Sequence, residues 1–144
     1  MTFEQLDAEL PNGFHDAQLY GFVVDYIAGS MTLRIDLWVG NLDGPDPEEY
    51  RPAELRVTGL YFCSLDPPDP NYRFIPDGSP LDVSGDPAKP DTLPALKEFS
   101  RTLPVGASCY RFFVHDWNSF IHIAAEEVQV SWIEDGASSA IATS

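Results

Sequence analysis

Basic residues are scarce in this sequence. The chain contains eight lysines and arginines but 23 aspartates and glutamates, which gives a formal net charge of −15. A surface with this excess repels nucleic-acid phosphates and anionic lipid headgroups, and it speeds encounter with a basic partner in a salt-dependent way. We therefore expect no binding to nucleic acid or to a membrane surface. Two interpretations of the charge stay open, namely solubility alone and attraction of a basic protein.

Long apolar runs are also absent. No stretch reaches the roughly 18 apolar residues of a membrane span, and the start MTFEQLDAEL has neither the basic nor the apolar segment of a secretory signal. The only two cysteines, Cys63 and Cys109, lie inside apolar stretches and not in a CxxC motif. We expect a cytoplasmic protein whose cysteines are buried and reduced rather than joined in a disulfide.

The motifs of common catalytic sites are missing as well. VGAS at 105–108 lacks the second glycine of a GxSxG nucleophile elbow. Cys109 begins the strand predicted to carry His115, but six residues of strand separate the two by about 20 Å, so they cannot pair along it. The acidic loops do not match the twelve-residue calcium-binding pattern. We expect a protein without a cofactor, and more readily a binding protein than an enzyme.

Alternation of apolar and polar residues is the clearest signal present. In SMTLRIDLWV at 30–39, every second residue is apolar, and together with residues 17–26 this stretch predicts a β-hairpin around IAG. Further strands are predicted at 53–65, with a bulge at Gly59, and at 108–116, 119–125 and 127–133.

Helices are predicted at two places. Thr2 and Gln5 can form a capping box for a short helix that ends at PNG, residues 11–13. LPALKEFSRTL at 93–103 has apolar residues at helical spacing. Residues 66–94 hold eight of the thirteen prolines, so we expect a long Pro- and Asp-rich loop there, with no central strand or regular helix.

These elements predict one α+β, mainly β domain over residues 1–134. Consecutive strands with short links favour a single mostly antiparallel sheet of about six strands, either open or curled toward a barrel. One or two short helices and the long loop 66–94 complete it. The small, polar residues 135–144 predict a flexible tail.

Two His-Asp pairs are the residues most able to carry chemistry. His15 and Asp16 precede the first strand, and His115 and Asp116 end a later one. If both strand ends lie at one edge of the sheet, the four side chains could form a His2Asp2 site for a divalent transition metal. In the structural alternative, the aspartates accept hydrogen bonds from turn amides. A metal-binding protein or metal-dependent enzyme built on these pairs is the alternative function.

A candidate interaction surface lies in the segments DPPDPNYRF and WNSF. They combine aromatic rings, stiff prolines and carboxylates, a composition suited to protein recognition at low entropic cost, although ordinary loop packing explains it equally well. The residues concerned are Tyr72, Phe74, Trp117, Asp66 and Asp69.

The segments GFHDAQL, VDY and LRIDLWVG, followed by YRPAELRVTGLYF and HDWNSFIHIAAEEVQV, resemble a group of small bacterial domains. These poorly characterised domains open with a His-Asp-Ala strand start, and several are thought to act as immunity proteins of bacterial toxin systems. The likeness spans most of the chain except the proline-rich loop. It implies a small β-rich protein without enzyme activity that shields its cell from a toxin domain.

The leading hypothesis is therefore a non-enzymatic binding protein whose acidic surface docks a basic partner. A homo-oligomer subunit without a ligand is a third hypothesis.

Overall fold

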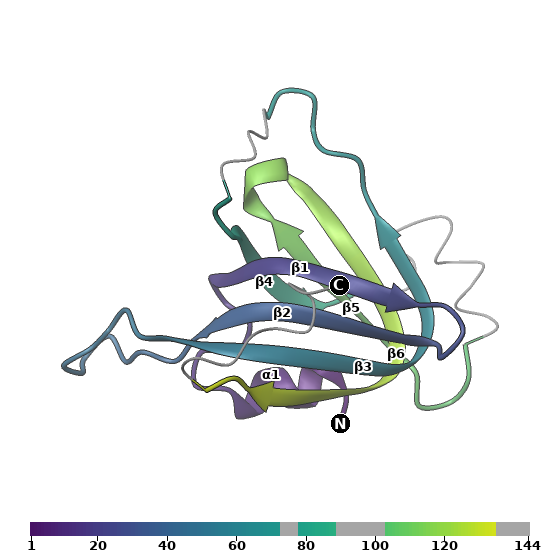
Figure 1. The fold of residues 1–144 in the computed structure, drawn as a ribbon, viewed down its shortest axis with the longest axis horizontal. Helices are drawn as coiled ribbons and strands as arrows, with labels where there is room; N and C mark the ends of the chain where they lie inside the picture. Colours follow the sequence, from purple (N-terminus) through teal and green to yellow (C-terminus); the bar gives the residue numbers. More distant parts are fainter. Residues whose placement is uncertain (73–77, 89–102, 135–144) are drawn as a thin grey trace.

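The computed structural model describes residues 1–72, 78–88 and 103–134, in which antiparallel strands close into a barrel (Figure 1). The strands are β1 (Ala17–Asp25), β2 (Ser30–Trp38), β3 (Tyr50–Leu65), β4 (Leu81–Pro87), β5 (Ser108–Val114) and β6 (Ser119–Trp132). Their order around the barrel is β1-β2-β3-β6-β5-β4, and β4 pairs with β1 to close it. The predicted single antiparallel sheet of six strands is confirmed, and it closes rather than remaining open.

The barrel interior is filled by the apolar residues that alternate along the strands. In β2, the inward-facing residues Met31, Leu33, Ile35 and Leu37 are at most 1% exposed. Burying each such side chain stabilises the fold by about 1.5–3 kcal/mol. The predicted alternation of this strand is thus confirmed.

The helix α1 (Phe3–Glu9) packs its buried residues Phe3 and Leu6 into this core. It begins with the predicted capping box between Thr2 and Gln5. Its residue Phe3 stacks on Tyr110 of β5 with ring centroids 5.0 Å apart, and Phe14 meets Phe112 of the same strand edge-on at 5.4 Å. The N-terminal segment therefore contributes aromatic rings to the core before the first strand begins.

Strand β4 corrects the expectation of a strandless loop at 66–94. The prolines of this segment flank the strand instead of interrupting it: Pro80 precedes it and Pro87 is its last residue. The residues between them keep the N–H groups that a ladder requires. Val83 is fully buried and pairs with Ala17 of β1 on one side and with Val114 of β5 on the other. β4 is therefore the strand that closes the barrel.

Other boundaries differ from the sequence prediction in smaller ways. The predicted strands at 119–125 and 127–133 form one continuous strand, β6, because β3 is long enough to pair with both halves. The predicted bulge is displaced: Gly59 has φ +60°, but the register of β3 against β6 shifts after it, between Leu60 and Phe62. The predicted helix at 93–103, apart from Leu103, and the tail at 135–144 lie outside the described residues.

The two cysteines are free, but they are half-buried rather than fully buried as predicted. Burial raises the pKa of both the Cys63 and the Cys109 thiol, which lowers the fraction of reactive thiolate at neutral pH. Within the described residues, no helix is long and apolar enough to cross a bilayer.

The barrel wall is incomplete on one side. In the described part of the chain, β1 pairs with β4 only through Ala17, Gln18 and Leu19. The pairing of β2 with β3 ends at Thr58, so the rest of β3 runs on along β6 alone. Residues 20–25 of β1 and 61–65 of β3 therefore each lack a strand partner on one edge within the described residues.

Candidate functional site

The two His-Asp pairs come together across strand β4. Asp16, just before β1, donates its backbone N–H to Ser84 Oγ of β4 at 3.1 Å, and the same oxygen lies 3.2 Å from Nε2 of His115, just after β5. His15 Nε2 lies 3.2 Å from the Asp16 carboxylate. The pairs are thus neighbours, as the metal hypothesis requires, but a serine stands between them.

The aspartates of the two pairs have different roles. Asp116 accepts the backbone N–H of Asp82 at 3.2 Å, an amide of strand β4 rather than the turn amide predicted for it. Asp16 has φ +50°, a left-handed conformation that aspartate tolerates better than most residues, and its carboxylate contacts His15 instead of a turn amide. Gly13, at φ +56°, provides the bend before it.

This cluster lacks a group that a serine-histidine catalytic site needs. A serine hydroxyl beside a histidine resembles a nucleophile and its base, but catalysis also needs a group that orients the histidine. Among the described residues, the ring of His115 contacts Ser84 and the edge of Phe113, and no carboxylate is hydrogen-bonded to it. In residues 1–72, 78–88 and 103–134, no three His, Cys, Asp or Glu side chains gather to hold a metal ion. The contacts fit a link that ties together the ends of β1, β4 and β5.

A groove beside Asp16 combines carboxylates with aromatic rings. We call it the acidic groove; it is about 410 Å³ in volume and is lined by Asp16, Trp38, Leu42, Pro47, Glu48 and Tyr50. Trp38 ends β2 and Tyr50 begins β3, and the two residues are paired across the ladder. The loop between these strands projects from the barrel at the left of Figure 1 and supplies the other wall.

Hydrogen bonds hold the walls of the acidic groove in place. The indole N–H of Trp38 donates to the carbonyl of Pro47 at 2.7 Å, which fixes the loop against β2. The hydroxyl of Tyr50 donates to the carbonyl of Asp16 at 3.0 Å, and the amide of Asn12 donates to the carbonyl of Trp38 at 3.1 Å. The aromatic rings are therefore positioned before any ligand arrives.

Acidic side chains lie near the hydroxyl of Tyr50 at the acidic groove. Burial raises the pKa of the Tyr50 hydroxyl, and the negative charges of Asp16, Asp82 and Glu48 raise it further. Nearby negative charge has this effect because it disfavours the phenolate. The groove therefore combines carboxylates with the half-buried rings of Trp38 and Tyr50.

Three arginines of the described chain are engaged away from the acidic groove. Arg34 lies 3.0 Å from Asp36, and Arg111 lies 3.2 Å from Asp86. Arg51 stacks over the ring of Trp132, with its guanidinium carbon 4.4 Å from the centroid. No arginine or lysine in the described ranges makes an ion pair with a carboxylate of the acidic groove. Its negative charge is not compensated by those residues.

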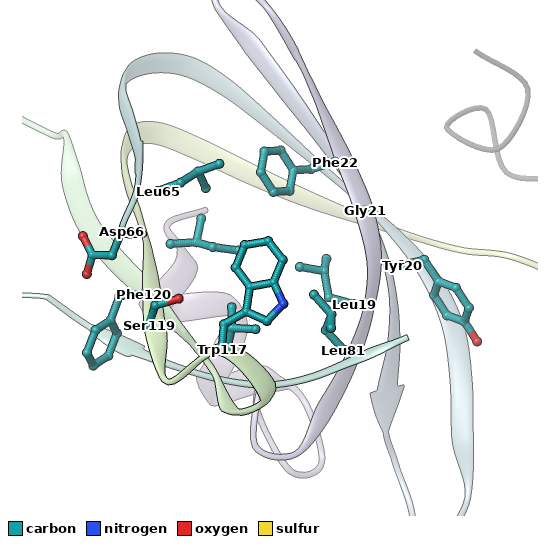
Figure 2. Close-up of a pocket in the computed structure, with 12 residues that line it drawn as sticks. Leu19, Tyr20, Gly21, Phe22, Leu65, Asp66, Leu81, Trp117, Ser119 and Phe120 are labelled. Carbon is teal, nitrogen blue, oxygen red and sulfur yellow. The ribbon is translucent and has the colours of Figure 1, made fainter. Parts of the chain in front are cut away.

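A second, apolar cavity lies at the side of the barrel where the wall is incomplete (Figure 2). It has a volume of about 200 Å³ and is lined by Leu19, Tyr20, Gly21, Phe22, Leu65, Asp66, Leu81, Val114, Trp117, Ser119, Phe120 and Ile121. Figure 2 shows the indole of Trp117 in the middle of this group, with Leu19 and Leu81 on one side of it. The predicted surface residue Trp117 therefore points into the cavity.

The other predicted interaction residues are divided among several roles. Asp66 lines the cavity, and its carboxylate lies 3.2 Å from Nε2 of His122, which is 3% exposed. Asp69 accepts hydrogen bonds from the backbone of Asn71 and the side chain of Asn118, and these bonds lower the pKa of its carboxyl.

Tyr72 is 49% exposed, and Phe74 lies outside the described residues. Of the predicted interaction residues, Asp66, Asp69 and Trp117 lie close together: Asp66 and Trp117 line the same cavity, and the backbone N–H of Asp69 donates to the carbonyl of Trp117 at 3.0 Å. Sequence reasoning also missed Trp38, Glu48 and Tyr50. The available signal was an aromatic residue at each end of the acidic connection 39–49.

Comparison with known proteins gives no functional relative. No protein-family model matches the chain, and no curated protein matches it. A crystal structure of an uncharacterized protein from Neisseria gonorrhoeae is similar over 82% of this chain and 92% of that chain, with 13% sequence identity and a TM-score of 0.45. A likeness at this level carries no argument about function.

Proposed function

We propose that this protein is a non-enzymatic binding module whose acidic groove docks a basic segment of a partner protein. The observation that supports the proposal is the placement of Asp16 and Glu48 beside the rings of Trp38 and Tyr50. An arginine side chain has the matching chemistry, because its guanidinium can stack on an aromatic ring and donate two hydrogen bonds to a carboxylate at the same time. An immunity-type interaction with a toxin domain would be one case of this function.

The net charge of −15 supports the same proposal over a longer range. Opposite charge on a partner raises the rate of encounter, and this effect falls as salt screens the charges. The groove then decides which basic segment binds, because aromatic stacking and carboxylate geometry act only at short range. Charge alone would attract many cations without selecting among them.

The test uses a short arginine-rich synthetic peptide and a matched peptide in which neutral citrulline replaces arginine. We expect calorimetry to show binding of the arginine peptide only, with the affinity falling as salt rises from about 50 to about 500 mM. Exchanging the carboxylates of the groove, in Asp16→Asn and Glu48→Gln, should weaken binding about tenfold, or about 1.4 kcal/mol.

The matched control is Glu127→Gln, which removes the same single charge. Glu127 pairs with Thr58, eight residues along β3 from Tyr50 and so roughly 26 Å away at the usual strand rise. We expect this variant to change affinity less than twofold. Equal losses in Glu127→Gln and in the groove variants would mean that net charge alone binds the peptide, and the proposal for the groove would fail. Binding that ignores salt would contradict its electrostatic part.

A further inference from the structure

We infer that the apolar cavity around Trp117 is a binding site for a small uncharged aromatic molecule of one or two rings. This site is separate from the acidic groove, and the inference does not depend on the proposed function. It follows from the volume of the cavity, the chemistry of its lining, the net charge of the molecule and the gap in the barrel wall beside it.

The volume sets the size of the ligand. The cavity measures about 200 Å³. A dry engineered cavity of roughly 150 Å³ lined by leucine, isoleucine and phenylalanine is sufficient to bind benzene. The space beside Trp117 therefore suits a ligand slightly larger than one ring, and it is too small for a long lipid chain.

The lining sets the chemistry of the ligand. Leu19, Leu81, Val114 and Ile121 contribute aliphatic surface, and Trp117 adds an aromatic face and edge. Aromatic rings gain attraction from offset or edge-to-face contact with such a partner, beyond the burial of area. An aromatic ligand therefore gains more from this lining than an aliphatic one of equal size.

The lining and the net charge of the molecule disfavour anions. None of the residues that line the cavity is basic, and Figure 2 shows the carboxylate of Asp66 pointing away from the cavity, on the side where it lies 3.2 Å from the ring of buried His122. The whole molecule carries a net charge of −15. A ligand with a carboxylate or phosphate would meet repulsion during approach and would lose its hydration without a basic partner inside. We therefore expect the site to take uncharged rings and to reject their acidic derivatives.

The gap in the barrel wall gives a ligand a way in. The cavity is bordered by residues 20–22 of β1 and by Leu65 at the end of β3, the segments whose outer edges have no strand partner among the described residues. A second hollow of about 370 Å³ shares Phe22 and Leu65 with it and extends toward Tyr26, which is 93% exposed. Entry along this side needs no opening of the strand ladder.

The test compares indole with indole-3-acetate, its anionic derivative, on the full-length protein labelled with ¹⁵N. We expect indole to shift the side-chain N–H signal of Trp117 saturably at millimolar concentration or below. Indole-3-acetate should bind at least fivefold more weakly. Leu65→Trp, which adds bulk at a position 54% exposed at the mouth, should weaken indole binding at least tenfold.

The control is Val105→Trp, which adds the same ring at a fully exposed position that does not line the cavity. It should leave indole binding unchanged. The inference is overturned if indole gives no saturable shift, or if both tryptophan variants weaken binding equally. Equal binding of indole and indole-3-acetate would overturn the exclusion of anions. These outcomes are independent of the peptide experiment, because the acidic groove is unchanged in both variants.

Discussion

Removal of the Trp117 side chain measures how much of the barrel's stability depends on its apolar cavity. Replacing a fully buried tryptophan with alanine costs about 3–5 kcal/mol, since apolar contacts are lost and a larger void remains. Trp117 is half-buried and packs against the core, so we expect Trp117→Ala to lower the free energy of unfolding by about 2 kcal/mol. A loss of this size is a large part of the total stability of a single domain.

Urea unfolding followed by circular dichroism measures this loss. The midpoint should fall while the dependence on urea stays the same, because the native fold is retained. Tyr26→Ala is the control: Tyr26 is 93% exposed, and its removal should change stability by no more than about 0.5 kcal/mol. A change below about 0.5 kcal/mol for Trp117→Ala as well would refute the reasoning, because the indole would then contribute no packing to the barrel.

Three further predictions concern other parts of the barrel. Ser84→Ala should cost about 1 kcal/mol in urea unfolding, because it removes the hydroxyl that accepts the backbone N–H of Asp16; a cost near zero would show that the link is unimportant. Gly59→Ala should cost at least about 1–2 kcal/mol, because φ is +60° there and an added Cβ would lie 2.6 Å from a carboxylate oxygen of Glu126. A neutral result would mean that β3 bends elsewhere. Tyr50 should titrate above its usual value of 10.0 in ultraviolet absorbance, and Asp16→Asn should lower its pKa. Because the folded-state pKa is raised, the stability linked to Tyr50 is fully present below about pH 10 and is lost as the pH rises through the folded value. An unchanged pKa of Tyr50 in Asp16→Asn would show that the charge of Asp16 does not affect the ionisation of the Tyr50 hydroxyl.

The metal hypothesis for the His-Asp pairs remains a separate prediction from sequence. Elemental analysis of the purified protein, together with thermal melting in the presence of a chelator, tests it directly. A stoichiometric metal and a lower melting temperature in chelator would support that alternative. In that case Ser84, which now lies between the pairs, would have to move away from His115.

The sequence alone determined the local elements of this protein. The alternation in β2 can bury one face only as a strand, and the capping box at Thr2 satisfies the first helical amides wherever the helix packs. The excess of acidic residues likewise follows from composition alone. The strand and the helix start depend on residues only a few positions apart, so the local sequence pattern predicts them directly.

Only the tertiary structure decided the closure of the barrel and the position of its two candidate sites. β4 has a short, proline-flanked sequence. It forms a strand because Val83 pairs with Ala17 of β1 on one side and with Val114 of β5 on the other. The acidic groove likewise needs Asp16 beside Tyr50, which lie 34 positions apart in the sequence. The apolar cavity needs Leu19 beside Trp117. Contacts of this kind depend on pairing between distant segments. The local pattern of apolar residues predicts a strand but does not predict which other strand will pair with it.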